Sequence, residues 1–201
     1  MAEPRRVRPR RSHAERTAET RGRILSAVVE TIAEAGFPAA TAVEITRRAG
    51  VTWGAVQHHF GGKDGMLVAV VEDSFAHFAA RLEDVPRAGA VQRRVALFLE
   101  RAWEHFGSVE YRSTFEILRS HLREVPNWQE RMFHALDAVW MQLFGDAPIP
   151  RRRHFLLQHY TIAVLSGLSA TLLLEGPHAR LRPAELDLLA DTLVRELQGA
   201  G

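Results

Sequence analysis

Apolar residues recur at helical spacing along most of the chain. Within residues 15–35, Ile24, Val28 and Ile32 lie four positions apart on one stripe, and Gly36 follows where a helix would end. The nine prolines separate further segments with the same period, at 66–82, 90–106, 109–123, 127–144, 151–175 and 183–198. No segment alternates apolar and polar residues beside a hairpin turn. The pattern therefore predicts an all-α protein of about nine helices.

One predicted helix is unusually poor in charge. Residues 155–174 contain no Asp, Glu, Lys or Arg, and their number equals the roughly 20 that a helix needs to cross a bilayer. The segment nevertheless carries polar side chains at Gln158, His159, Tyr160, Thr161, Ser166, Ser169 and Thr171. These side chains make it too polar for a lone helix in lipid, so we expect a soluble protein in which this helix is buried on most sides.

The most informative segment reads TAVEITRRAGVTWGAVQHHF and begins at Thr41. Thr41 and Glu44 have the spacing of a capping box, in which the hydroxyl accepts from the backbone N–H of residue 44 and the carboxylate reaches back to the cap. We expect a short helix to begin here, with Val43 and Ile45 as its apolar contacts. Gly50 then supplies the tight turn that follows this helix.

A second short helix is predicted over residues 53–59, because Thr52 suits the position of its N-cap. Val56 and Phe60 are four positions apart and should pack inward against the first helix. The remaining positions offer hydrogen bonds, apolar contact or close approach of the backbone, at Thr52, Trp53, Gly54, Gln57 and His58. Two short helices joined at a glycine turn match the helix-turn-helix unit, whose second helix enters the major groove of DNA. Gln57 has the bidentate geometry that reads adenine, but contact with a base and contact with a phosphate both stay open.

Charge supports an interaction with DNA because it is unevenly distributed. The net charge is only +2, yet residues 1–23 carry eight arginines against three glutamates, a local balance of +5, whereas residues 63–201 have a balance of −2. A basic N-terminal arm suits nucleic acid or another anionic surface, and a solvated tail is the alternative. We assign Arg11, at the end of this arm, to the DNA-contacting set.

Several kinds of chemistry are excluded or disfavoured by the residues present. The chain has no cysteine, which excludes disulfides, thiol nucleophiles and cysteine metal sites and fits a reducing cytoplasm. Gly61-Gly62-Lys63 fails as a phosphate-binding P-loop because Asp64 follows the lysine where Ser or Thr is needed. His58 and His59 are adjacent, so their side chains diverge on a helix and make poor joint ligands. We therefore expect no metal, no cofactor and no enzymatic activity.

The residues from about 15 to 67 resemble the DNA-binding domain of the TetR family of transcriptional regulators. The resemblance is carried by Gly36, Phe37, Thr41, Ile45, Ala49, Gly50, Val51, Gly54, His59, Phe60, Lys63 and Leu67 at their spacings. It implies a three-helix DNA-binding domain, an all-α C-terminal domain for ligand binding and dimerisation, and repression that a small molecule relieves. Two positions depart from the family: Gln57 stands where Tyr is common and Trp53 where Lys is frequent. One phosphate contact is therefore absent or taken over by His58.

The resemblance implies a division into a flexible basic arm at 1–13, a helix-turn-helix domain at 14–62 and a ligand-binding and dimerisation domain at 63–201. In the family, the position of Lys63 opens the fourth helix and touches a phosphate, and the free N–H groups of a helix start also favour an anion there. The predicted DNA-binding residues are Arg11, Thr41, Thr52, Trp53, Gly54, Gln57, His58 and Lys63.

Rings and polar groups share the helices between about 90 and 165, where the resemblance places a ligand. A cavity lined by rings and a few polar groups is the usual form of a small-molecule site, although any single ring at helical spacing more often belongs to the core. The predicted ligand-binding residues are Trp103, Phe106, Phe115, Trp128, Phe133 and His159.

The last two helices, 151–175 and 183–198, are the predicted homodimer interface, because small residues there allow close packing and charge is depleted. A two-fold dimer would present two recognition helices to a near-palindromic operator. The sequence thus predicts a cytoplasmic regulator of transcription, most simply a repressor released by a small molecule. The alternative is a helical small-molecule-binding or enzymatic domain whose contact with DNA is incidental. Peripheral membrane binding through the basic arm is a third, weaker hypothesis.

Overall fold

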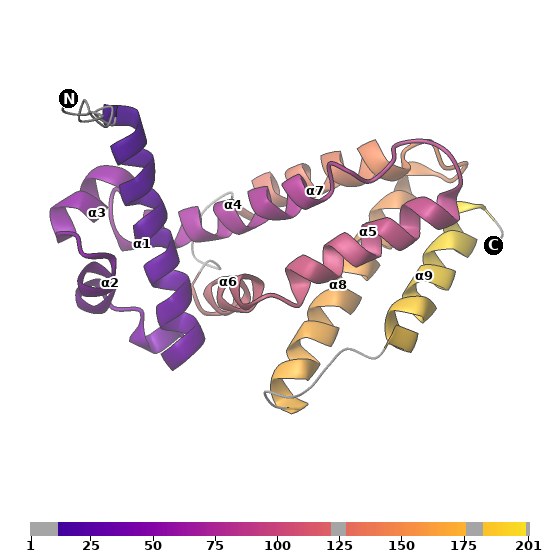
Figure 1. The fold of residues 1–201 in the computed structure, drawn as a ribbon. Helices are drawn as coiled ribbons and strands as arrows, with labels where there is room; N and C mark the ends of the chain where they lie inside the picture. The colour runs from indigo at the N-terminus through magenta and orange to yellow at the C-terminus, as the bar shows by residue number, and fades with distance from the viewer. Residues whose placement is uncertain (1–11, 122–127, 176–182, 200–201) are drawn as a thin grey trace, which may run out of the picture.

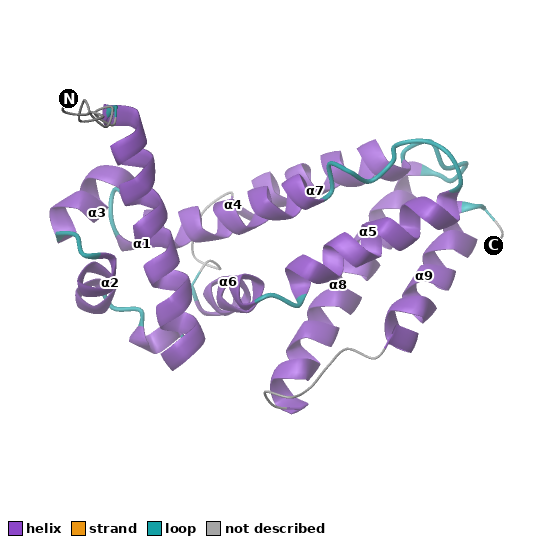
Figure 2. Cartoon of the chain, in the orientation of Figure 1, coloured by secondary structure: helices purple, strands orange, loops and turns teal. Residues whose placement is uncertain are grey.

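The computed structural model describes residues 12–121, 128–175 and 183–199, and over these ranges the chain forms nine α-helices and no strand (Figures 1 and 2). This confirms the all-α prediction. One 3₁₀ turn, η1 at Phe37–Ala39, follows the first helix. The helices are α1 His13–Ala35, α2 Ala42–Ala49, α3 Trp53–Phe60, α4 Lys63–Arg81, α5 Val91–Phe106, α6 Val109–Ser120, α7 Trp128–Phe144, α8 Arg151–Glu175 and α9 Pro183–Leu197.

The N-terminal core lies between α1, α2, α3 and the first half of α4. Ile24, Ile45, Val56 and Leu67 come one from each of these helices, and none of them is exposed to solvent. Full burial of such a side chain contributes about 1.5–3 kcal/mol. These contacts hold the two short helices in place, since helices of eight residues are not stable in isolation.

The C-terminal core gathers α5, α7, α8 and α9 at the other end of the molecule (Figure 1). Phe98, Phe144, Leu165 and Leu193 represent these four helices in it, and all are buried. Phe98 and Phe144 meet edge to face with ring centroids 5.5 Å apart, an arrangement that aromatic pairs prefer.

Helix α4 runs from one core to the other, and α6 packs against both α1 and α4 (Figure 1). Met66 and Val70 lie in the N-terminal core, whereas Phe78, two turns later, lies in the C-terminal core. The division at residues 62 and 63 stays a prediction, but packing joins the first half of α4 to the helix-turn-helix. Helix α4 therefore contributes side chains to both cores.

Helix α8 is less buried within the chain than its sequence suggested. An 18-residue window within Arg151–Leu172 has a mean hydropathy of 1.3, so the segment is long and apolar enough to cross a membrane, and 28% of that window is buried. Phe155, Leu156 and Tyr160 are about half exposed. The expectation that this helix is buried on most sides is therefore wrong for the single chain, because only one of its faces packs against the core.

Candidate functional site

Thr41 is the N-cap of α2, as predicted, but it forms only half of the expected capping box. The Thr41 hydroxyl accepts a hydrogen bond from the backbone N–H of Glu44 at 3.2 Å. The Glu44 carboxylate does not return to the cap; it binds Arg47, with Nη2 to Oε1 at 2.6 Å, and this hydrogen bond lowers the pKa of Glu44. The reciprocal bond was therefore predicted wrongly, because the arginine competes for the same carboxylate.

One apolar contact predicted for α2 is also wrong. Ile45 is fully buried, whereas Val43 is 77% exposed. Two residues that are two positions apart on a helix point about 200° apart, so they cannot both face one core. Val43 instead lies on the outer surface of α2.

The turn between α2 and α3 has the geometry that a helix-turn-helix requires. Gly50 adopts a left-handed conformation, with φ 63° and ψ 41°, and its N–H caps α2 by bonding to the Arg47 carbonyl at 3.3 Å. Thr52 then caps α3 as predicted, its hydroxyl accepting from the Ala55 N–H at 3.3 Å. Val56 is buried and fixes the inner face of α3.

The outer face of α3 presents the predicted DNA-binding positions to solvent. Thr52, Gly54, Gln57 and His58 are exposed, and Trp53 is half-buried against the N-terminal core. A Cβ on Gly54 would approach no atom closer than the Thr52 hydroxyl, at 3.7 Å. Contacts within the chain therefore do not require glycine at this position, and its effect is to leave the helix surface open to close approach.

Gln57 is held by its own helix. In the amide orientation that gives both polar atoms a partner, its oxygen accepts from the Trp53 indole N–H at 3.1 Å and its nitrogen donates to the Gly61 carbonyl at 3.1 Å. The indole and the amide, four positions apart, thus form one unit on the face of α3. One N–H and one lone pair of the amide stay available, so a base or phosphate can bind Gln57 without displacing either partner.

Lys63 is the first residue of α4, where the resemblance placed it. No side chain caps this helix start, and the Lys63 ammonium lies 5.8 Å from the centre of the Phe37 ring. Gly65, which the sequence analysis did not single out, fixes the crossing of α3 and α4: a Cβ there would lie 2.0 Å from the Phe60 carbonyl oxygen. That clash depends on how the two helices meet, and helical periodicity carries no signal for it.

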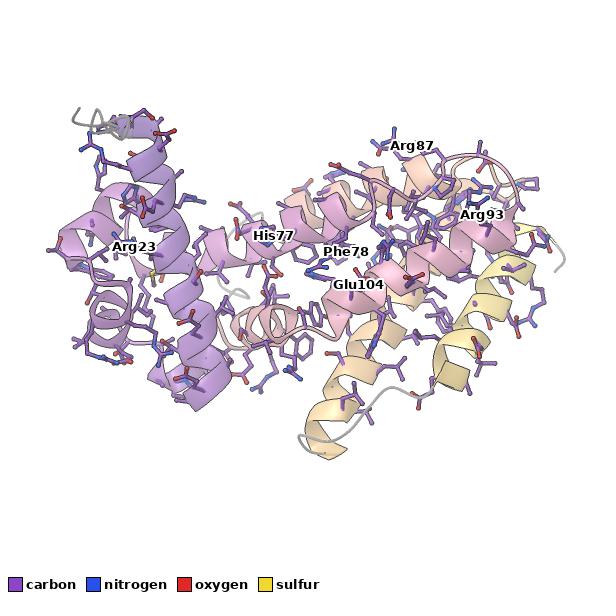
Figure 3. The ribbon with its side chains drawn as sticks, in the orientation of Figure 1. Arg23, His77, Phe78, Arg87, Arg93 and Glu104 are labelled. Carbon is purple, nitrogen blue, oxygen red and sulfur yellow. The ribbon has the colours of Figure 1, made fainter. Side chains whose placement is uncertain are left out.

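Two arginines of α1 were missed as candidates. Arg23 is exposed and reaches the α2–α3 turn, with Nη1 3.9 Å from the place of a Cβ on Gly50 (Figure 3). Arg21 lies over the Phe60 ring, 4.7 Å from its centre. Their position in the basic N-terminal stretch was the available signal. Arg11 and most of the predicted arm lie outside the described residues.

The C-terminal half contains a small apolar cavity between α4, α5, α7 and α8. Its volume is about 20 Å³, which is room for about one water molecule. No charged side chain lines it, and Gln158 and Thr161 are its polar residues. The lining residues are Phe78, Leu82, Phe98, Phe106, Leu136, Val139, Trp140, Gln158, Thr161, Ile162 and Leu165.

The structure brings one of the predicted ligand-binding residues, Phe106, into this cavity. Trp103 and Phe115 are half-buried at the edge of the C-terminal core, outside the lining. Phe133 and His159 stack on each other at the surface of α7 and α8, with ring centroids 5.1 Å apart. Trp128 begins α7, and its side chain lies outside the described residues. The ligand assignments stay predictions.

Buried polar groups lie behind the rings that line the cavity: His105 contacts Phe78, and Tyr111 contacts Phe106. Tyr111 and Ser166 share a hydrogen bond of 2.7 Å that links α6 to α8, and burial raises the pKa of Tyr111 to about 12. His105 is 1% exposed and stacks on Phe78, and burial lowers its pKa to about 4. His105 is therefore uncharged at neutral pH. Neither of its ring nitrogens has a hydrogen-bond partner among the described residues.

Asp73, His77 and Glu110 place one potential metal-ligand atom each within 4.8 Å of one another, near the middle of the molecule (Figure 3). His77 Nδ1 lies 2.8 Å from Glu110 Oε1, and this hydrogen bond raises the pKa of His77. The direct bond accounts for their approach without an ion. The expectation that the protein holds no metal stays a prediction.

Two short helices joined at a left-handed glycine, the second with an open outer face, define a helix-turn-helix DNA-binding protein. A family model described as "Bacterial regulatory proteins, tetR family" matches residues 24–70. The HTH-type transcriptional regulator BetI of Escherichia coli O139:H28 is 36% identical over 181 residues, covering 69% of this chain and 93% of the relative. The chain belongs to the TetR family of bacterial transcriptional regulators, which confirms the resemblance and makes it a DNA-binding regulator of transcription.

Two further comparisons differ in how much they cover. The regulator BetI 1 of Chromohalobacter salexigens is 37% identical over 89 residues, 44% of this chain, and the match spans only 40% of that relative. A solved transcriptional regulator from Rhodococcus sp. Rha1 superposes with a TM-score of 0.66 at 22% identity, covering 90% of this chain and 96% of that one, which shows the shared fold. These relatives are regulators and not enzymes, as the sequence predicted, so the enzymatic alternative falls away.

Proposed function

We propose that the protein is a homodimeric, cytoplasmic repressor that binds a near-palindromic operator and leaves it when a small molecule occupies the C-terminal cavity. The observation that carries this proposal is the position of α4. Its first residue, Lys63, stands beside the recognition helix, and Phe78 on the same helix lines the cavity. A ligand that displaces Phe78 acts on the helix that begins at the DNA-binding surface.

The DNA-binding surface of the proposal comprises the outer face of α3 and the two helix starts beside it. Gln57 and His58 reach toward base edges or phosphates from α3, and Thr41 and Thr52 offer hydroxyls at the starts of α2 and α3. Lys63 brings a positive charge to the open N-terminus of α4, where backbone N–H groups already favour an anion. Arg11 and the rest of the arm add phosphate contacts outside the described residues. Trp53 and Gly54 determine how closely the surface of α3 can approach the DNA.

The dimer interface in the proposal is formed by α8 and α9. The outer face of α8 carries Phe155, Leu156 and Tyr160, each about half exposed, and Leu188 on α9 is 70% exposed. A large apolar area with few charges is what an obligate dimer buries. A second copy of the chain would cover this face, which explains the apolar character of α8 without a membrane.

Helix α6 would supply a second connection to the DNA-binding helices, besides α4. The Ser113 hydroxyl donates to the Val29 carbonyl of α1 at 3.1 Å, and the Phe37 N–H donates to the Glu116 carboxylate at 2.9 Å. One turn of α6 thus holds the N-terminal unit at two points. A hundredfold loss of operator affinity needs only about 2.7 kcal/mol of differential ligand binding, a modest demand on such a connection.

The test is a gel shift with the DNA upstream of the protein's own gene, in the presence of excess competitor DNA. Specific binding, with a footprint whose two halves lie one or more helical turns apart, supports the proposal. Binding that competitor DNA removes completely, there and at divergently oriented neighbouring genes, contradicts it. Small-molecule extracts that release the protein from its operator would then identify the chemical class of the effector.

A further inference from the structure

The walls of the C-terminal cavity are aromatic and uncharged. Phe98 and Trp140 meet edge to face with centroids 6.0 Å apart, and Phe78 and Phe106 do the same at 5.7 Å. Such walls offer ring faces and edges to a further ring. Because no lining residue carries a charge, an anionic ligand would lose its hydration without compensation there. A cation would gain only the attraction of the ring faces, which is smaller than the cost of burying its charge.

Gln158 is the exception to this apolar wall. Its side chain is 3% exposed and lines the cavity, and its amide nitrogen has no hydrogen-bond partner in the described part of the chain. The other polar residue of the wall is already engaged, since the Thr161 hydroxyl donates to the Leu157 carbonyl of its own helix at 2.7 Å. A buried N–H group without an acceptor is costly, so this donor is available to a group that enters the cavity.

We propose that the cavity selects uncharged aromatic ligands that carry a hydrogen-bond acceptor, which the Gln158 amide binds. This inference rests on the proposed function, in which the cavity is the effector site. A ring is larger than the cavity's volume of about 20 Å³, so the wall must open. Leu136, Val139 and Ile162 are only partly buried, which places the movable wall between α7 and α8.

Four one-ring probes of similar shape test this selection on the full-length protein. They are 4-fluoroacetophenone, 4-fluorocumene, 4-fluorobenzoate and 4-fluorophenyltrimethylammonium, and fluorine line broadening gives the dissociation constant of each. The ketone and the hydrocarbon differ in solubility, so the ratio of their affinities is compared between proteins. Gln158→Met keeps the length of the side chain and removes the donor, and we expect it to shift this ratio about 3- to 10-fold against the ketone. Gln142→Met, on the exposed surface of α7, is the matched control and should leave the ratio unchanged.

An unchanged ratio in Gln158→Met overturns the role of Gln158, and a benzoate or ammonium probe that binds as tightly as the ketone overturns the selection of uncharged ligands. No binding by any probe overturns the inference as a whole, as expected if the cavity holds only a water. If Gln158→Met does not fold, Gln158→Leu replaces it. Operator binding is measured on the same proteins without probe. A wild-type protein that does not bind the operator counts against the proposed function, whereas operator binding by a protein that binds no probe counts against this inference alone.

Discussion

The indole N–H of Trp53 donates to the side-chain amide of Gln57 across one turn of α3, at 3.1 Å. Both residues depart from the usual TetR pattern, and the structure shows that the two departures form one pair. The indole orients the amide, which also donates to the Gly61 carbonyl. Gln57 is therefore pre-positioned on the outer face of α3, and we expect any contact that it makes with DNA to depend on Trp53.

We expect the two residues to be energetically coupled in operator binding. Gln57→Ala should remove about 1–3 kcal/mol of discrimination at one base pair if the amide reads a base. Trp53→Phe keeps a ring and removes the donor, so the effect of Gln57→Ala should change by about 0.5–3 kcal/mol in that background. Fluorescence anisotropy with operator variants measures all four proteins, and Gln142→Ala is the remote control. Strictly additive effects would show that the pair acts independently, and equal weakening on every sequence would assign Gln57 to the phosphate backbone.

The basic arm should contribute affinity without sequence preference. Ser12 caps α1 through reciprocal hydrogen bonds with Glu15, at 2.7 and 3.1 Å, so a clean deletion ends at residue 11 and spares the cap. Removing residues 1–11 should weaken binding to all DNA and make the plot of log affinity against log salt shallower by about 0.9 per lost phosphate contact. DNA affinity is measured between about 50 and 300 mM salt, where phosphate contacts dominate the salt dependence. A slope equal to that of the full-length protein would make the arm a passive tail.

The contact between Phe37 and Glu116 should stabilise the junction of α6 with the N-terminal unit. Glu116→Met removes the acceptor of the Phe37 N–H, and hydrogen bonds to charged groups contribute about 1.5–3 kcal/mol. We expect a loss of that order in the free energy of unfolding and faster amide exchange at Phe37. Glu116→Gln keeps an acceptor and should retain most of the stability. Equal losses in both variants would mean that the charge matters and the hydrogen bond does not.

His105 should make the protein less stable in acid. Burial holds its pKa at about 4, below the ordinary value of 6.5, so the unfolded chain takes up a proton first as the pH falls. The contribution of neutral His105 to the free energy of unfolding is complete above pH 6.5. It is lost as the pH falls toward 4, by about 3 kcal/mol in total. Chemical unfolding of His105→Leu should therefore show a flatter dependence on pH in this window. His134→Leu, at an exposed position of α7, should keep the wild-type slope. Identical slopes in all three proteins would exclude His105 as the origin.

The helices could be predicted because apolar residues recur every three or four positions along each of them. Ile24, Val28 and Ile32 form the predicted stripe of α1 and are all buried, and Thr52 caps α3. In a helix of only eight residues, few apolar positions define which face is buried. For this reason Val43 was predicted on the inner face of α2, although it lies on the outer surface.

Long-range packing accounts for the rest of the difference between sequence and structure. Phe106 lines the cavity and Phe133 lies on the surface, although both are rings at helical spacing, because the packing of α5, α7 and α8 against one another decides which side is enclosed. The buried Arg94 was also unforeseen. Its guanidinium binds the Leu143 carbonyl and the Asp146 carboxylate, at 2.9 and 2.7 Å, and both partners come from a distant part of the chain.

The proposed dimer interface can be tested at Gly167 without disturbing the fold of one chain. This residue is exposed on α8, and a Cβ built on it meets no atom within 4 Å, so a single chain accepts a larger side chain there. Two α8 helices packed closely together would not, because arginine at this position holds the backbones apart and buries a charge. Gly167→Arg should therefore convert a dimer to a folded monomer in sedimentation equilibrium, with an unfolding midpoint at low concentration close to that of the wild-type monomer. Operator affinity should fall by more than tenfold, since one recognition helix reads one half-site.

Ala96→Arg places the same change on the exposed face of α5 and should leave both properties intact. If Gly167→Arg remains a dimer that binds the operator normally, α8 is not the interface.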